Sequence, residues 1–251
     1  MTLIIGLACS DGVVMAADSA GTEPLLGVRQ NVTKIVKPSK MNFLVGASGD
    51  AGFIQEVFEA LEKIPRSPQN IEELREYLRN NLRKVVDRAY PQLERLYQER
   101  LASGQIFVPP CSLLLAGWWR SEAVLCTYEL PGQLFDHSRE RRNFYSIGSE
   151  AKTALAVAQL LKPPYQLTVE QGKVYAMLVM ETVYALTPGG VAPPTQLHAF
   201  IAQKGHILVP EKDIDEIRKR ASEWQNAVWQ SFAEFFADLT QPPRAPSAEV
   251  P

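Results

Sequence analysis

The chain opens with two apolar, β-prone runs that predict a pair of buried strands. Leu3 to Cys9 and Val13 to Ala17 are separated by Ser10-Asp11-Gly12, and Asp-Gly between two hydrophobic runs is a strong signal for a tight β-hairpin. Because both runs are almost continuously apolar, we expect this hairpin to be buried. The fold must therefore place the very start of the chain inside a sheet.

The next segments predict further paired strands. The polar, glycine-containing stretch from Asp18 to Asn31 predicts a loop or irregular ribbon. Lys34 to Lys37 and Asn42 to Ala47 predict an antiparallel pair that turns at Pro38-Ser39-Lys40.

Helical periodicity follows. Apolar residues recur at helical spacing from Phe53 to Ile64, and a second apolar stripe runs from Ile71 to Leu96 behind an N-cap at Asn70. We expect Pro91 to kink this second helix. The remaining predicted elements are strands at 112–117, 123–129, 132–135 and 143–147, helices at 149–161 and 168–185, a hairpin over 196–209 and a helix at 211–239.

This order predicts an α+β fold of four layers. Short turns between strands favour antiparallel sheets, and two helix pairs inserted between strand blocks favour a helical layer on each side. We therefore expect an α/β/β/α sandwich of two antiparallel sheets, formed by a single domain over residues 1–240. Residues 241–251 include four prolines and predict a disordered tail.

Composition excludes several classes of partner and cofactor. The formal net charge is −2 with acids and bases interspersed, so we expect no binding to nucleic acid or to membranes. Three cysteines and three histidines show no metal-ligand spacing, so we expect no metal and no cofactor. The odd cysteine count and the lack of a secretory leader or spanning segment predict a cytoplasmic protein.

Thr2 is the first residue with potential chemistry. Methionine aminopeptidase generally removes Met1 when the next residue is small, which would leave Thr2 with a free α-amine. That amine titrates near neutral pH, with an ordinary pKa of about 8. One residue would then supply both a hydroxyl nucleophile and a general base.

Asp18 and Lys34 are placed to assist Thr2. The hairpin returns Asp18 to the neighbourhood of its own start, and Lys34 opens the next strand. A lysine ammonium beside Thr2 would favour the unprotonated amine and lower the pKa of the hydroxyl. Taken without further context, the same two residues are more simply interpreted as an ordinary surface ion pair, worth at most about 1 kcal/mol.

The N-terminal segment resembles the mature N-terminus of proteasome β subunits. The run from Thr2 through Gly6, Asp11-Gly12-Val13-Val14 and Ala16-Ala17-Asp18 is similar to that family's pattern, and Lys34 stands at the family's distance from the threonine. The resemblance implies an N-terminal-nucleophile (Ntn) hydrolase fold and threonine peptidase activity.

The same resemblance assigns further roles. It implies that the Gly46 N–H points into the oxyanion hole, that Ser149 supports the threonine amine, and that Gly21, Thr22, Gly46 and Ser48 line the substrate cleft. The family's supporting aspartate after the fourth helix has no counterpart here, where the sequence reads Ala185-Leu186-Thr187-Pro188-Gly189-Gly190.

Partners follow from the resemblance alone. It implies peptide or unfolded-protein substrates, a homo-oligomeric ring and an ATP-dependent unfoldase that feeds it. Two alternatives stay open: an Ntn amidohydrolase acting on small amides, and a catalytically inert ring-forming subunit.

Overall fold

The structure is a computed structural model. It describes residues 2–22, 29–105, 109–119, 121–129, 132–137, 143–161, 166–187 and 191–240. The predicted tail at 241–251 lies outside the described residues.

Two five-stranded antiparallel sheets form the centre of the molecule. The first has the order β10 (Phe144–Gly148), β1 (Leu3–Ala8), β2 (Gly12–Asp18), β11 (Thr195–Ile201) and β12 (Gly205–Leu208). The second has the order β5 (Ile35–Val36), β6 (Phe43–Gly49), β7 (Cys111–Trp119), β8 (Glu122–Glu129) and β9 (Gln133–Asp136). A two-stranded ribbon, β3 (Ala20–Thr22) and β4 (Arg29–Asn31), leads from the first sheet to the second.

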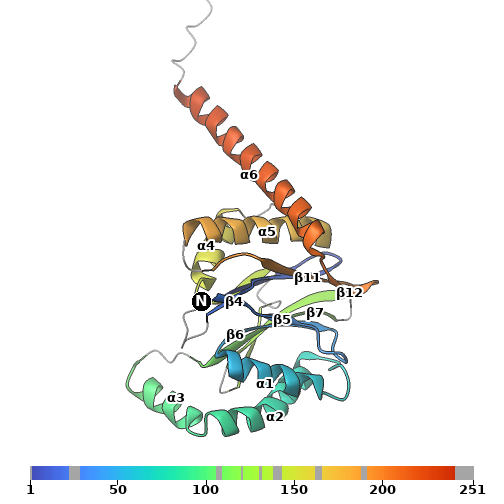
Figure 1. The fold of residues 1–251 in the computed structure, drawn as a ribbon, viewed down its shortest axis with the longest axis vertical. Helices are drawn as coiled ribbons and strands as arrows, with labels where there is room; N and C mark the ends of the chain where they lie inside the picture. Colours follow the sequence, from blue (N-terminus) through green and yellow to red (C-terminus); the bar gives the residue numbers. More distant parts are fainter. Residues whose placement is uncertain are drawn as a thin grey trace, which may run out of the picture.

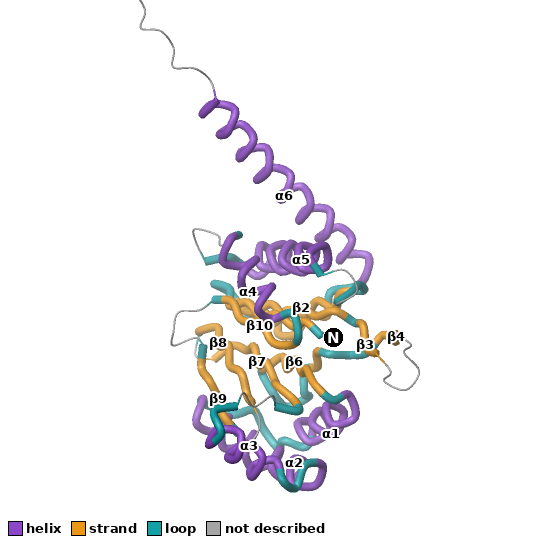
Figure 2. The backbone as a smooth tube through the Cα atoms, turned by 90° about the vertical axis from the view of Figure 1, so that its left-hand side faces the viewer, coloured by secondary structure: helices purple, strands orange, loops and turns teal. Residues whose placement is uncertain are grey.

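Helices cover the outer face of each sheet. The helices α1 (Ala51–Glu62), α2 (Ile71–Ala89) and α3 (Leu93–Ala102) lie against the second sheet, whereas α4 (Ala151–Leu160), α5 (Val169–Leu186) and α6 (Glu211–Thr240) lie on the side of the first (Figure 1). The same four layers are visible in the perpendicular view, where α6 extends well beyond the sandwich (Figure 2). The predicted α/β/β/α sandwich is confirmed.

The apolar residues of β1 and β2 explain why this hairpin is buried on both faces. Ile4 and Met15 pack between the two sheets with Leu44 and Leu114. Leu3 and the other odd-numbered apolar residues of β1 pack outward against α4 and α5. Because side chains alternate along a strand, a strand between two apolar layers must be apolar at nearly every position. The predicted buried hairpin is confirmed, with Ala8 paired to Val13 across its turn.

The helix pair over the second sheet differs from the prediction. We expected one long helix kinked at Pro91, but α2 ends at Ala89 and α3 begins at Leu93. Proline lacks an N–H donor and drives the preceding residue out of the helical region; Tyr90 has φ −137° and ψ 66°. The buried part of the stripe therefore lies on α2 and ends at Leu93 of α3, whereas Leu96, the last residue of the predicted stripe, is 45% exposed.

The α5 helix begins where its sequence predicts. Thr168 accepts from the Gln171 N–H, and the Gln171 side chain reciprocally accepts from the Thr168 N–H. This capping box fixes the start of the helix that packs on β2.

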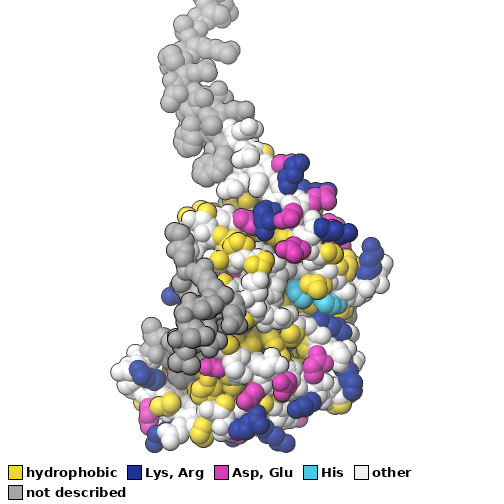
Figure 3. Space-filling view, viewed as in Figure 1, with side chains coloured by type: hydrophobic (Ala, Val, Ile, Leu, Met, Phe, Trp, Pro, Cys, Tyr) yellow, Lys and Arg dark blue, Asp and Glu magenta, His cyan; other side chains and the backbone are white. Residues whose placement is uncertain are grey.

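The visible surface carries both signs of charge. In the view of Figure 3, Lys and Arg side chains are interspersed with Asp and Glu over the helices at both ends of the molecule. None of the described helices is long and apolar enough to cross a membrane. Within the same described part of the chain, no cluster of three or more His, Cys, Asp or Glu residues could hold a metal ion.

Candidate active site

Asp18 joins the start of the chain to Lys34. Its Oδ1 atom accepts from the Leu3 N–H at 2.8 Å and from the Lys34 ammonium at 2.8 Å. The Asp18 side chain is fully buried, and that of Lys34 is only 6% exposed. Leu3, the residue after Thr2, and Lys34 thus share one carboxylate oxygen of Asp18. The start of the chain, Asp18 and Lys34 lie close together, as the hairpin predicts.

The Lys34 ammonium is held from two directions. Besides Asp18, it donates to the carbonyl oxygen of Ala20 at 2.8 Å. Burial lowers the pKa of Lys34, while the hydrogen bond and the negative charge of Asp18 oppose that shift. The two hydrogen bonds fix the position of the Lys34 side-chain nitrogen beside the beginning of β1.

Ser149 contacts Thr2 with both of its hydrogen-bonding functions. The Thr2 nitrogen donates to Ser149 Oγ at 3.1 Å, and Ser149 Oγ donates to the Thr2 carbonyl oxygen at 3.2 Å. The hydroxyl can therefore serve as acceptor for the Thr2 nitrogen and orient the residue at the same time.

Gly148 allows this approach. It pairs with Leu3 at the end of β10, has φ +105°, and a Cβ there would lie 2.1 Å from the Thr2 carbonyl oxygen. Only glycine adopts this backbone conformation without strain and leaves space for Thr2. The Gly-Ser turn thus brings residues far apart in sequence together at the start of β1.

The structure does not support the role expected of the Gly46 N–H. The neighbouring Ala47 N–H donates to the Lys34 carbonyl oxygen at 3.0 Å, so it points toward β5. Successive N–H groups of a strand point to opposite sides, and the Gly46 N–H therefore points toward β7, where Gly46 pairs with Leu114. Gly46 is an interior residue of β6, and the expected donor role is corrected on this geometry.

Gly49, which the resemblance does not single out, has the opposite placement. The same alternation turns its N–H to the side of Lys34, at the exposed end of β6. Gly49 has φ +134°, and a Cβ there would lie 2.1 Å from the Pro110 carbonyl oxygen. The available signal was its position immediately before Asp50, which caps α1 by accepting from the Phe53 N–H.

The predicted cleft residues lie on two elements: Gly21 and Thr22 on the ribbon strand β3, and Gly46 and Ser48 on β6. Gly21 and Thr22 lie on the ribbon β3, paired with Gln30 and Arg29 of β4. Ser48 is only 7% exposed, and alternation along β6 turns its side chain toward the first sheet, as at Gly46.

A hydrogen-bonded pair of hydroxyl groups, one from α5 and one from β11, lies near Asp18. The Tyr184 hydroxyl and Thr195 Oγ1 lie 3.0 Å apart, and Thr195 is paired with Asp18 between β11 and β2. Burial raises the pKa of Tyr184, and the charge of Asp18 adds to that shift. The stretch at 188–190, part of the segment where the resembling family carries its second acid, lies outside the described residues.

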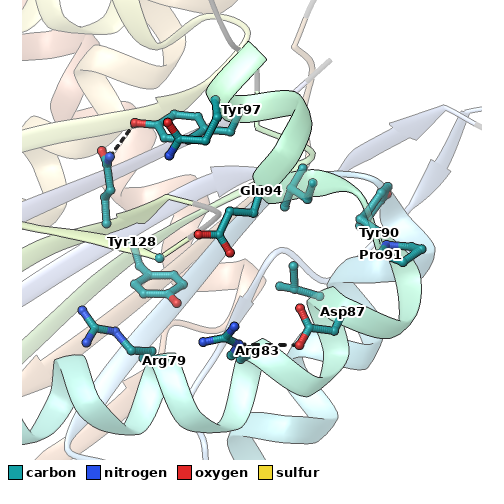
Figure 4. Close-up of a pocket in the computed structure, with 13 residues that line it drawn as sticks. Arg79, Arg83, Asp87, Tyr90, Pro91, Glu94, Tyr97 and Tyr128 are labelled. Atoms are coloured by element: carbon teal, nitrogen blue, oxygen red, sulfur yellow. Dashed lines mark hydrogen bonds and ion pairs between the residues drawn. The ribbon is translucent and has the colours of Figure 1, made fainter. Parts of the chain in front are cut away.

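A separate pocket opens on the other side of the second sheet. It has a volume of about 580 Å³ and lies between α2, α3 and the β8–β9 hairpin. Arg79 and Arg83 extend from α2 beneath the Tyr128 hydroxyl, with Glu94 above them (Figure 4). None of the predicted site residues lines this pocket.

Fold and site together define an Ntn-hydrolase-type sandwich whose threonine end is tied to a buried acid-lysine pair. The family model of the proteasome subunit matches residues 2–187. The chain therefore belongs to the proteasome subunit family.

Solved structures agree on the fold. Anbu (ancestral beta-subunit) from Yersinia bercovieri is 17% identical with a TM-score of 0.65, over 97% of this chain and 100% of that one. An Anbu (Gly-1) mutant from Hyphomicrobium sp. strain MC1 is 14% identical with a TM-score of 0.66, over 93% and 97% of the two chains. No curated protein sequence matches the chain significantly.

Proposed function

We propose that this chain is an N-terminal threonine peptidase whose nucleophile is the Thr2 hydroxyl once Met1 is removed. The observation that carries the proposal is the double contact of Asp18 Oδ1, 2.8 Å from both the Leu3 nitrogen and the Lys34 ammonium. This double contact holds the start of β1 and the lysine ammonium on the same carboxylate oxygen, which is the proximity of charge and chain start that the mechanism requires.

The mechanism assigns a step to each group. The Thr2 hydroxyl attacks the substrate carbonyl carbon and passes its proton to the Thr2 amine, directly or through one water. Lys34 supplies positive charge that favours the unprotonated amine and the developing alkoxide. Ser149 accepts from the amine and keeps it in place.

The developing oxyanion is assigned to a donor on β6. The Gly49 N–H replaces Gly46 in this role, because it is on the side of Lys34 rather than of β7. Such a donor typically stabilises the transition state by about 3 kcal/mol. The substrate's carbon–nitrogen bond then breaks, its nitrogen takes the proton from the Thr2 ammonium, and water hydrolyses the remaining ester.

Substrate, assembly and location are parts of the same proposal. Members of the proteasome subunit family assemble into rings, and we extend this to a homo-oligomeric ring of the present chain, in the cytoplasm, that encloses its Thr2 sites. Peptides or unfolded proteins are the substrates, delivered by an ATP-dependent unfoldase. Gly21 and Thr22 on the edge of β3 would pair with the substrate backbone.

A peptide epoxyketone tests the nucleophile directly. The threonine hydroxyl adds to the ketone and the amine opens the epoxide, so a stable ring forms only when both groups belong to one terminal residue. We expect intact mass to show loss of Met1 and addition of one whole reagent, mapped to Thr2. Thr2→Ser should retain the adduct and Thr2→Ala should lose it. A chain that keeps Met1 and takes up no reagent would support the inert ring subunit.

Substrate class needs a second comparison. Fluorogenic peptides and small acyl-amides should be offered to the same preparation, with Thr2→Ala as the blank. Faster turnover of the small amides would favour the amidohydrolase alternative.

A further inference from the structure

Gln196, at the start of β11, uses all four of its hydrogen-bonding positions to join the two sheets. Its Oε1 accepts from the Lys34 N–H at 3.0 Å and from the Ile35 N–H at 3.4 Å. Its Nε2 donates to Ser19 Oγ at 3.1 Å and to the Val32 carbonyl oxygen at 2.5 Å. A primary amide has two donor hydrogens and two acceptor lone pairs, so the side chain is fully satisfied.

These four contacts fix both ends of one excursion of the chain. Ser19 directly follows Asp18, and Val32 lies two residues before Lys34. The Val32 N–H also donates to the Ser19 carbonyl oxygen at 2.9 Å. Gln196 therefore closes the base of the segment that carries the ribbon β3–β4 and presents Asp18 and Lys34 to each other.

The backbone of Lys34 depends on this side chain. Lys34 directly precedes β5. Of its backbone N–H and carbonyl groups, only the carbonyl is bonded to the neighbouring strand β6, where it accepts from the Ala47 N–H. The Lys34 N–H takes the Gln196 side chain instead. Because the lysine side chain is a flexible four-carbon stem, a backbone that shifts would carry the ammonium away from Asp18.

We propose that Gln196 is a positioning residue that holds the Lys34 ammonium against Asp18 at the start of β1. It touches neither the substrate nor the reacting atoms, and acts only through the backbone of Lys34 and the base of the ribbon. The inference rests on the proposed function insofar as it concerns activity, but the placement of Lys34 can be measured without any activity.

The test compares three variants of the full-length protein. Gln196→Met keeps the side-chain length and removes all four hydrogen bonds. Ser19→Ala removes only one acceptor of Nε2 and serves if the first variant melts too early to study. Gln203→Met changes an exposed glutamine in the β11–β12 turn and is the matched control.

The first measurement is the rate of epoxyketone labelling at Thr2 as a function of pH. Misplacement of a catalytic group by about 1 Å can reduce rates by about a hundredfold, so we expect labelling to slow at least tenfold in Gln196→Met and less in Ser19→Ala. The pH dependence should also shift, because the charge beside the Thr2 amine has moved. Gln203→Met should match the wild type in both.

The second measurement is the titration of Lys34 by NMR of ¹³Cε-labelled lysine, assigned by loss of the signal in Lys34→Met. Burial is the largest cause of the lowered Lys34 pKa, so a loosened Lys34 that gains water should titrate closer to the ordinary lysine value in Gln196→Met.

The two measurements separate the two proposals. If the wild type takes no label at Thr2, the proposed function fails, and the Lys34 titration still decides the role of Gln196. Unchanged Lys34 titration in both Gln196→Met and Ser19→Ala would overturn the positioning role. A slower rate with an unaltered pH profile and unaltered Lys34 titration would also overturn it, since that pattern indicates general loosening.

Discussion

Asp18 and Lys34 are sixteen residues apart in sequence and form a 2.8 Å ion pair that is almost completely removed from solvent. Asp18 ends a strand of the first sheet and Lys34 precedes a strand of the second. The pair therefore lies where the two sheets meet at the start of β1. Its position has consequences for stability as well as for chemistry.

Removing one member of this pair should destabilise the fold strongly. Lys34→Met leaves the Asp18 carboxylate buried with the Leu3 N–H as its remaining described donor, and an uncompensated buried charge typically costs about 3–5 kcal/mol. We expect the free energy of unfolding, measured by urea titration, to fall by about that amount.

The matched control is an exposed pair. Arg83 and Asp87 on α2 lie 3.6 Å apart, with side chains 67% and 66% exposed, and such pairs contribute at most about 1 kcal/mol. Arg83→Met should therefore change the unfolding free energy little. Similar losses in the two variants would contradict the burial argument.

Gly148→Ala should be costly for a steric reason. The added Cβ would lie 2.1 Å from the Thr2 carbonyl oxygen at φ +105°, so the backbone must move as well as adopt a strained conformation, which by itself costs about 1–3 kcal/mol. We expect a lowered melting temperature together with loss of Thr2 labelling. Gly205→Ala also has a positive φ, +78°, but open space around it. Gly205→Ala should therefore show only the cost of the strained backbone conformation. An equal fall in melting temperature for the two variants would contradict a steric clash between the added Cβ at Gly148 and Thr2.

Ser149→Ala should impair chemistry more than stability. The Ser149 hydroxyl is the described partner of the Thr2 nitrogen at 3.1 Å, and its loss leaves the amine free to rotate. Since positioned acid–base groups typically contribute about 10²–10⁴-fold in rate, we expect epoxyketone labelling to slow by at least about tenfold while the melting temperature stays close to that of the wild type. Ser103→Ala, at an exposed helix end, is the control, and normal labelling of Ser149→Ala would remove Ser149 from the mechanism.

Stability should fall in mild acid because of His198. Burial, and then the charge of His206, lower the pKa of His198 from 6.5 to about 4. The unfolded chain therefore binds a proton that the folded protein refuses between these values, so stability is lost as pH falls from 6.5 toward 4, on the order of 3 kcal/mol in all. In His198→Gln the unfolding free energy should vary less over this range. If the unfolding free energy varied equally with pH in the wild type and in His198→Gln, the acid sensitivity could not be assigned to His198.

The elements set by local rules were largely predictable. The N-terminal hairpin follows from an Asp-Gly turn between apolar runs, and the α5 start follows from Thr168 with Gln171, because each depends on residues a few positions apart. Pro91 correctly marks an interruption, but its strength was underestimated: whether a proline bends a helix or ends it depends on the packing of the two halves against the sheet.

In the candidate site, too, some features follow from local sequence and others from the packing of distant segments. Thr2, Asp18, Lys34 and Ser149 could be named from spacing and resemblance, and the structure brings them together. The same resemblance predicts the Gly46 N–H as the oxyanion donor, yet the direction of a strand N–H depends on which neighbouring strand pairs with it. That pairing comes from the register of β6 between β5 and β7.

By itself, the sequence determined the two-faced apolar hairpin, the four-layer order of strands and helices and the residue types at the start of the chain, because turns, caps and periodicity are local properties. Only the tertiary structure decided that Gly49 rather than Gly46 offers its N–H on the side of Lys34, and that Gln196 joins Ser19 and Val32 to the Lys34 backbone. Both depend on contacts between segments as many as 177 residues apart, and no short window of sequence contains the two partners of such a contact.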